Sequence, residues 1–155
     1  MRSPWLLVPP PLLFVGAFAA GVAFDRVVPL PLLPGSLHDL GRGLGIALIA
    51  VAAALIAPSI ALFIYRRTTI VPHSARARAL VAAGPFRVTR NPMYLGLAVA
   101  TLGGTLVANV VWPLLTAALP LWVMDARVIP HEEATLSRIF GDDYRAYQKK
   151  VRRWI

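Results

Sequence analysis

Two adjacent glutamates, Glu132 and Glu133, are the residues of this 155-residue chain whose type and position best suit chemistry. They follow Pro130, which suits the first turn of a helix, and the helix dipole ordinarily explains acidic side chains there. At about 100° per residue, however, Glu132 lies within about 40° of both Leu136 and Ile139, on the apolar side of that helix. A carboxylate on an apolar side is costly unless it is paired or bound. We therefore predict that Glu132 binds a ligand.

Metal and thiol chemistry find no support in the composition. The chain has no cysteine, which excludes a disulfide framework, a thiol nucleophile and a thiolate-ligated metal. His38, His73 and His131 show no metal-ligand spacing, so no metal is predicted. No G-x-G-x-x-G sequence follows a strand, so a Rossmann cofactor site is not expected and any cofactor site must be helical.

A second set of chemically useful residues lies between residues 80 and 96. Gly84 and Pro85 predict a turn, and Pro92 suits the first turn of a following helix. Tyr94 then offers an aromatic face and a hydroxyl, although a tyrosine at a membrane interface is an alternative interpretation. Gly96 allows close packing of helices.

These residues form two motifs that resemble the isoprenylcysteine carboxyl methyltransferase family and its phospholipid N-methyltransferase relatives. The first motif is a G-P-F turn followed by Arg90-Asn91-Pro92-Met93-Tyr94-Leu95-Gly96. The second reads Glu132-Glu133-Ala134-Thr135-Leu136-Ser137-Arg138-Ile139-Phe140-Gly141-Asp142-Asp143-Tyr144-Arg145-Ala146-Tyr147, and Arg153-Trp154-Ile155 follows it. The resemblance covers about the C-terminal half of the chain, from Arg78 onward.

The resemblance implies an integral-membrane methyltransferase that uses S-adenosylmethionine, with S-adenosylhomocysteine as product. It also implies a cofactor pocket that faces the cytosol and is closed by the C-terminal helices. The cofactor-binding residues that it implies are Ala79, Leu80, Val81, Phe86, Arg90, Asn91, Pro92, Met93, Tyr94 and Glu132.

The expected catalytic residues are Glu132, Glu133 and Arg127. A carboxylate acceptor needs no base, only a cation such as Arg127 to position it, whereas an amine acceptor must lose a proton, for which Glu133 is the plausible base. Two positions depart from the family pattern. Asn91 stands where His is commoner and cannot titrate near neutral pH, and Val128 stands where the prenylcysteine enzymes place an arginine.

The elements that must position these residues belong to a membrane protein. Hydrophobic residues make up 57% of the chain and charged residues only 15%, so lipid must solvate much of its surface. Residues 5–24 and 44–65 are long enough to span a bilayer, although 5–24 can also be interpreted as a signal peptide. Residues 92–124 are too long for one span and should fold back near Ala108-Asn109 as a tight hairpin.

The positive charge indicates orientation. The net charge of +9 would suit nucleic acid in a soluble protein, but here its position explains it without nucleic acid. The link 66–91 contains six arginines and no acid, which predicts that it is cytoplasmic. An even number of crossings then places both termini in the cytoplasm.

The tail 125–155 is predicted to form two short cytoplasmic helices that divide at Gly141. In the second helix, Tyr144, Tyr147, Val151 and Trp154 would share one side, as in an amphipathic helix at a membrane surface. The expected fold is therefore all-α and polytopic, with about four transmembrane helices in a single domain and a C-terminal amphipathic tail.

The sequence favours methyl transfer from S-adenosylmethionine to a lipophilic acceptor, most simply the carboxylate of an isoprenoid or prenylcysteine-like molecule. Two alternatives stay open: N-methylation of a phospholipid amine, and a non-catalytic membrane scaffold of the same fold. The expected partners are the bilayer and a lipophilic small molecule or lipid substrate, which can enter laterally. The oligomeric state stays open.

Overall fold

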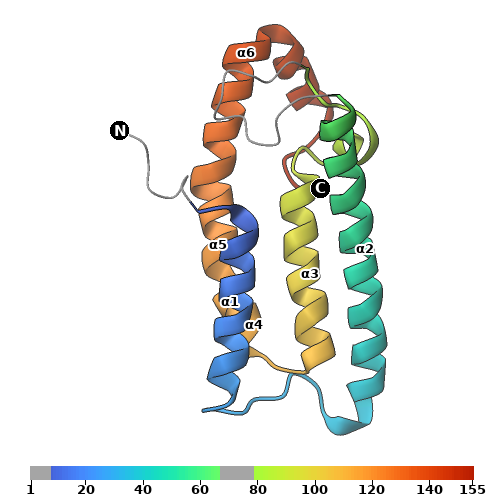
Figure 1. Cartoon of the computed structure of the whole chain (residues 1–155), viewed down its shortest axis with the longest axis vertical. Coiled ribbons are helices and arrows are strands. Elements are labelled where there is room, and N and C mark those ends of the chain that lie inside the picture. The colour runs from blue at the N-terminus through green and yellow to red at the C-terminus, as the bar shows by residue number, and fades with distance from the viewer. Residues whose placement is uncertain (1–7, 67–78) are drawn as a thin grey trace.

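The computed structural model describes residues 8–66 and 79–155, and their regular structure is helical apart from one isolated β-bridge between Pro31 and Val110 (Figure 1). The start of the predicted span 5–24, and Arg67, His73, Arg76 and Arg78 of the predicted basic link, lie outside the described residues. The elements in chain order are α1 (Pro10–Asp25), η2 (Gly35–Leu37), α2 (His38–Tyr65), η3 (Gly84–Arg87), α3 (Pro92–Ala108), α4 (Trp112–Thr116), α5 (Ala118–Val123), η4 (Met124–Val128) and α6 (Ile129–Lys150).

Helix α1 begins within the run of prolines near the N-terminus. Pro9 is the N-cap, and Pro10 and Pro11 occupy the first turn, where a helix needs no backbone donor. The prolines therefore start the helix and shorten the regular part of the predicted span to 16 residues.

Helices α2 and α3 pack together through small residues. A Cβ atom added to Gly45 would lie 2.6 Å from the carbonyl oxygen of Gly103, and one added to Gly103 would lie 2.7 Å from the carbonyl oxygen of Gly45. Nearer the first motif, a Cβ on Gly96 would lie 2.6 Å from the Ile56 side chain. The prediction that Gly96 allows close helix packing is therefore confirmed.

The chain turns back after α3 at Asn109, where the breakers in the sequence predict a hinge. Asn109 has a left-handed backbone with φ of 54°, a conformation that Asn tolerates better than most residues. Its side chain accepts a hydrogen bond from the Leu33 N–H at 2.8 Å and donates one to the Leu33 carbonyl at 3.1 Å. The turn is thereby attached to the connection between α1 and α2.

After this turn the chain is helical almost without interruption to Lys150. Thr116 of α4 donates a hydrogen bond to the Ala17 carbonyl of α1 at 2.7 Å, which joins the two helices. Segment η4 is a π-helical turn in which the Ile129 N–H bonds to the Met124 carbonyl, five residues back. The helix changes direction again at Gly141, whose φ of 52° and ψ of −120° are non-helical.

Two helical stretches, residues 35–65 and 112–150, are long and apolar enough to cross a membrane. The second has 39 residues, or about 58 Å at 1.5 Å per residue, so it is far longer than a hydrocarbon core of about 30 Å. It carries no charge before Asp125, and charged residues are frequent from there on. The apolar part of this stretch therefore ends before Asp125.

Large apolar side chains cover the outer surface of the helices. Only 11% of the most apolar part of the 35–65 stretch is buried inside the protein, and Leu40, Leu44 and Ile64 are among its exposed side chains. Such a surface suits lipid rather than water. The prediction of an all-helical protein of the membrane type is confirmed for the described residues.

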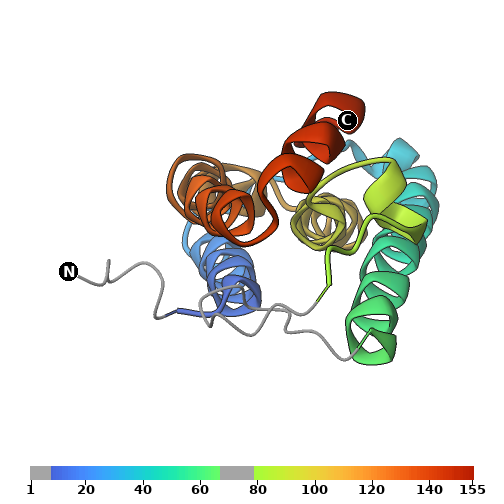
Figure 2. The same cartoon turned by 90° about the horizontal axis from the view of Figure 1, so that it is seen from above.

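The helices form one bundle in which α1 lies beside α4 and α5, and α3 lies beside α2 (Figure 1). Seen from above, α3 lies between α2 and the α5–α6 stretch, and the end of α6 turns over toward the C-terminus next to them (Figure 2). Both motifs consequently meet at one end of the bundle.

Candidate functional site

The contact at the centre of the site joins Tyr94 to Glu132. The Tyr94 hydroxyl, in the first turn of α3, donates a hydrogen bond of 2.7 Å to the Glu132 carboxylate, in the first turn of α6. The two residues are 38 positions apart in the sequence. The structure therefore brings the two predicted motifs into direct contact.

Glu132 lies in a largely apolar environment. The Tyr94 side chain packs against a buried cluster of Phe14, Val123, Met124, Val128 and Ile129. Burial raises the pKa of the Glu132 carboxyl to about 7, the Tyr94 hydrogen bond opposes that rise, and the nearby charge of Glu133 adds to it. This carboxyl can consequently change its charge near neutral pH.

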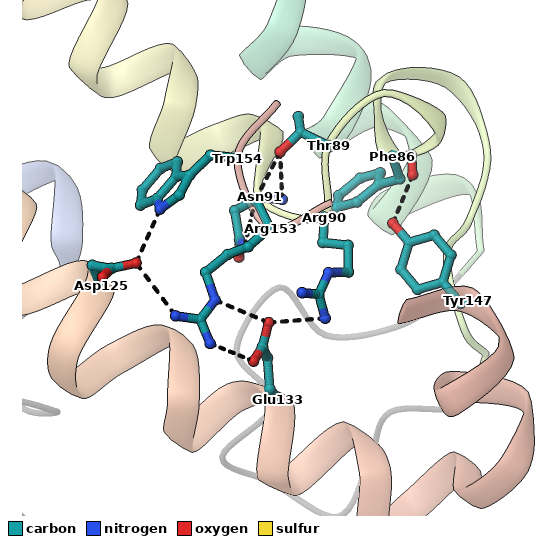
Figure 3. Close-up of polar contacts among 9 residues, drawn as sticks. All are labelled: Phe86, Thr89, Arg90, Asn91, Asp125, Glu133, Tyr147, Arg153 and Trp154. Carbon is teal, nitrogen blue, oxygen red and sulfur yellow. Dashed lines mark hydrogen bonds and ion pairs between the residues drawn. The ribbon is translucent and has the colours of Figure 1, made fainter. Parts of the chain in front are cut away.

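Glu133 has quite different surroundings (Figure 3). Its carboxylate forms one ion pair with Arg90 at 3.0 Å and another with Arg153 at 2.8 Å, and only 15% of its side chain is exposed. Two arginines therefore bind this carboxylate, and both of its oxygens are engaged.

The C-terminal segment after α6 is fastened to the start of α3. The Arg90 N–H donates to the Arg152 carbonyl at 3.0 Å. The hydroxyl of Thr89 and the side-chain amide of Asn91 both donate to the Arg153 carbonyl, at 2.9 and 3.1 Å (Figure 3). The Asn91 amide is thus bound to the protein's own backbone.

Asp125 holds the same segment from the other side. Its carboxylate accepts a hydrogen bond from the Trp154 indole at 2.9 Å and pairs with Arg153 at 3.4 Å (Figure 3). Trp154 also packs against the buried cluster next to Tyr94. The last residues of the chain therefore form part of the site.

The second part of α6 packs on the first motif. The Tyr147 hydroxyl donates to the Phe86 carbonyl at 2.6 Å, and the Phe86 ring packs edge-on against Phe63 of α2. Tyr144 and Tyr147 are only 2% and 9% exposed. The expectation that these tyrosines face a membrane surface is therefore wrong, because the first motif covers them.

The prediction that Val151 and Trp154 continue the helical side of Tyr144 and Tyr147 is also wrong. Helix α6 ends at Lys150, and Val151 is extended, with φ of −125° and ψ of 130°. Trp154 therefore reaches Asp125 from a non-helical segment and does not continue the row of Tyr144 and Tyr147.

Some predicted site residues lie away from the Tyr94–Glu132 contact. Arg127 is exposed, and its guanidinium lies over the Trp122 ring at 5.7 Å. Val128, at the position where relatives place an arginine, is buried in the apolar cluster.

The predicted cofactor-binding residues other than Tyr94, Glu132, Arg90 and Asn91 are mainly packed against protein. Phe86, Pro92 and Val81 are buried, whereas Ala79, Leu80 and Met93 are half-buried. These residues line the approach to α3 without a polar side chain to offer.

Thr89 and Asp125 were not singled out from the sequence, and Arg153 and Trp154 were noted there without being predicted as site residues. Thr89 lies inside the first motif and is completely buried. Arg153-Trp154 follows the second motif directly, which was the available signal, but a motif does not reveal which residue is the partner. Among the described residues, no group of three or more His, Cys, Asp or Glu could hold a metal ion.

Two relatives of the chain are named as isoprenylcysteine O-methyltransferases. A protein-S-isoprenylcysteine O-methyltransferase of Schizosaccharomyces pombe is 36% identical over 72 residues, or 46% of this chain and 30% of that protein. A probable protein-S-isoprenylcysteine O-methyltransferase of Oryza sativa is 34% identical over 82 residues, or 51% of this chain and 41% of that protein. The chain thus spans less than half the length of these two relatives.

A shorter relative matches over its whole length. An uncharacterized protein of Haemophilus influenzae is 38% identical over 63 residues, which are 41% of this chain and 100% of that protein. No solved structure matches the chain significantly. The family model described as phospholipid methyltransferase matches residues 40–143, which include Tyr94, Glu132 and Glu133. The chain therefore belongs to the phospholipid methyltransferase family.

Proposed function

We propose that the protein is a membrane methyltransferase that transfers a methyl group from S-adenosylmethionine to a lipophilic acceptor. The observation that carries this proposal is the 2.7 Å hydrogen bond between Tyr94 and Glu132, which joins the two motifs within the part of the chain that matches the family. Relatives named as isoprenylcysteine O-methyltransferases support the reaction class.

The residues present suit the polar groups of this donor. Its amino acid part carries one ammonium and one carboxylate group. Glu132 supplies an acid in apolar surroundings. Arg90 Nη1 is paired with Glu133 at 3.0 Å, whereas the buried Nε of Arg90 has no hydrogen-bond partner among the described residues. A buried polar group without a partner is costly, so a ligand group at Nε would satisfy it.

We assign the roles accordingly. Glu132 would hold the ammonium group, Tyr94 orients the Glu132 carboxylate, and Arg90 would hold the carboxylate group of the donor. The donor supplies an activated methyl group on its sulfonium. The protein's part is alignment and exclusion of water, because methyl transfer is an in-line displacement.

Glu133 was expected to act as a base, but its surroundings favour another role. Both oxygens of this carboxylate are engaged by two arginines, so we assign Glu133 to holding the site together. Arg127, which lies over Trp122, would reach an acceptor only from the outer surface.

The favoured acceptor is a carboxylate, as in an isoprenoid or prenylcysteine-like molecule. A carboxylate needs no base, which suits a site where Glu133 is paired and Glu132 would hold the donor. A phospholipid amine is the second candidate, and the name of the matching family favours it. An amine must lose a proton, and Glu132, with its pKa near 7, would accept it only if another group held the ammonium of the donor.

We further propose four crossings, with both motifs and both termini on the cytoplasmic side. Helices α1 and α3 have 16 and 17 residues, or about 24 and 26 Å, so they would cross a thin or locally thinned bilayer. The arginines of the link 66–91 and the cations of the tail support this orientation.

Calorimetry with S-adenosylhomocysteine tests the proposed function. We expect the wild-type protein to bind and Glu132→Ala to bind at least tenfold more weakly, because the acid that holds the ammonium is lost. Asp142→Asn is the matched control, since Asp142 is on the same helix and its side chain is 94% exposed. No binding by the wild type at millimolar ligand would refute the donor site.

Product analysis separates the acceptors. Purified protein in vesicles would be given labelled donor with either a prenylcysteine analogue or a phospholipid. A base-labile methyl ester supports the carboxylate acceptor, whereas alkali-stable label in the lipid supports the amine. Donor binding without any methylated product would favour a non-catalytic scaffold.

A further inference from the structure

Arg153 contacts three separate parts of the site. Its guanidinium binds Glu133, the fifth residue of α6, at 2.8 Å and Asp125 in η4 at 3.4 Å. Its backbone carbonyl accepts hydrogen bonds from Thr89 and Asn91, directly before α3. One residue of the C-terminal segment thus joins the helix of the second motif to the start of the first.

These contacts restrict the rotation of α6 about its own axis, and this rotation sets the direction in which Glu132 projects. Glu132 and Glu133 are neighbours on one helix, so their side chains project about 100° apart from the same turn. Tyr94 holds Glu132 on one side, while Arg153 and Arg90 hold Glu133 on the other. A rotation of this turn that freed Glu133 would also carry Glu132 away from Tyr94.

The same contacts bear on the distance between the two helices. Asn91 is the N-cap of α3, and its side chain is bound to the carbonyl of Arg153, whose guanidinium is bound to Glu133. The start of α3 is therefore connected to α6 in two ways: through Arg153, and through the direct hydrogen bond between Tyr94 and Glu132. Only 34% of the Arg153 side chain is exposed, which limits competition by water.

We propose that Arg153 is a positioning residue, which keeps Glu132 aligned with Tyr94 without itself touching the donor. This inference rests on the proposed function, because the aligned carboxylate is the one assigned to the donor's ammonium group. A displacement of about 1 Å in such a site can cost on the order of 100-fold in rate. Arg90 would still hold Glu133 after loss of Arg153, so we expect a smaller effect.

The test compares Arg153→Ala with Arg153→Lys and with a control, Lys150→Ala. Lys150 is an exposed cation at the end of α6, so its removal makes the same change in net charge. We expect Arg153→Ala to raise the Kd for S-adenosylhomocysteine about tenfold and Arg153→Lys to restore part of the affinity. Lys150→Ala should bind as the wild type does.

Hydrogen exchange supplies a readout that needs no ligand. The Arg90 amide bonds to the Arg152 carbonyl at 3.0 Å, so it should be protected in the wild type. We expect faster exchange of this amide in Arg153→Ala and not in Lys150→Ala. Unchanged exchange would show that Arg153 does not hold the C-terminal segment in place, and would overturn the proposal.

The outcomes separate positioning from stability alone. Thermal unfolding is measured on the same samples, and a lower Tm with wild-type affinity would overturn the positioning role. If Arg153→Ala does not fold, Asn91→Ala, which removes one hydrogen bond to the same carbonyl, should show a smaller loss of affinity in the same direction. No binding by the wild type would refute the proposed function, whereas equal binding by wild type and Arg153→Ala would refute only the positioning role.

Discussion

The neighbouring carboxylates of Glu132 and Glu133 differ in their surroundings, and we therefore assign them different roles. Glu132 has a single hydroxyl donor and apolar neighbours, so its carboxyl titrates near neutral pH. Glu133 lies between two arginines and forms an ion pair with each. The helical angles placed Glu132 on the apolar side correctly, but no angle could show that two arginines from distant positions would meet Glu133.

Affinity for S-adenosylhomocysteine should depend on pH through Glu132. Burial raises the pKa of this carboxyl to about 7, and only the ionised form pairs with an ammonium group. Binding should therefore weaken as the pH falls below about 7, by up to tenfold per pH unit, and release a proton at pH 6. Calorimetry in two buffers with different ionisation enthalpies measures both effects.

Variants of this pair sharpen the test. Glu132→Gln should remove the pH dependence, and Tyr94→Phe should move its midpoint upward, because the Tyr94 hydrogen bond lowers the pKa of Glu132. In the absence of ligand, the raised pKa of Glu132 makes the folded protein less stable as the pH rises, whereas it makes ligand binding stronger. The folded-state pKa lies above the ordinary value of 4.5, so stability is lost as the pH rises from about 4.5 to about 7. An affinity that does not change between pH 5.5 and 8.5 would contradict the assignment.

At the scale of elements, local signals were predictable and contacts between elements were not. Asn109 and Gly141 interrupt helices where the sequence indicated, because a left-handed or glycine-only backbone is a property of one residue. Tyr144 and Tyr147 are buried because they pack on the segment that contains η3, about sixty residues away in the sequence. A pattern of aromatic residues along a helix shows that one side is apolar, but not whether lipid or protein covers it.

Because α2 and α3 pack closely, we expect alanine to change the stability of the protein very differently at Gly45 and at Gly43. Gly45→Ala should destabilise the protein by about 1 to 3 kcal/mol, since the new Cβ would lie 2.6 Å from the Gly103 carbonyl oxygen. Gly43→Ala has nothing within 4 Å and should be neutral or slightly stabilising. Unfolding in detergent measures both, and equal stability of the two variants would argue against the helix contact.

At Gly141, where α6 changes direction, we expect alanine to lower stability through backbone strain and not through a steric clash. A Cβ at Gly141 would have nothing within 4 Å, yet the φ of 52° is unfavourable for alanine. Gly141→Ala should therefore cost about 1 to 3 kcal/mol. Gly16→Ala, in the open middle of α1, is the control and should not destabilise the protein. Thermal unfolding compares the two, and a neutral Gly141→Ala would speak against the observed kink.

At the scale of the whole molecule, the positions of the charges and of the apolar surface support the proposed orientation. The apolar surface of the helices suits lipid, and the two motifs meet at the end where the cations of the tail lie. Composition alone predicted a membrane protein, because 57% hydrophobic residues exceed what a soluble surface allows. The number of crossings does not follow from composition, since α1 and α3, with 16 and 17 residues, are short for a span.

Cysteine labelling tests the orientation, and the natural chain has no cysteine to remove. Ser36→Cys, in η2, and Lys149→Cys, near the end of α6, should react with an impermeant maleimide from opposite sides of the membrane. The tail position should react only from the cytoplasmic side. Labelling of both positions from one side would contradict the proposed crossings.

The π turn at Met124–Val128 has a consequence for evolution by insertion and deletion. A π turn holds one residue more than an α-helical turn, and each residue turns a helix by about 100°. If a residue such as Ala126 were lost and the turn became α-helical, everything after it would rotate by that angle relative to α5, and Glu132 would leave Tyr94. The contact between Tyr94 and Glu132 therefore depends on the number of residues between α5 and the acid pair, and not only on which residues they are.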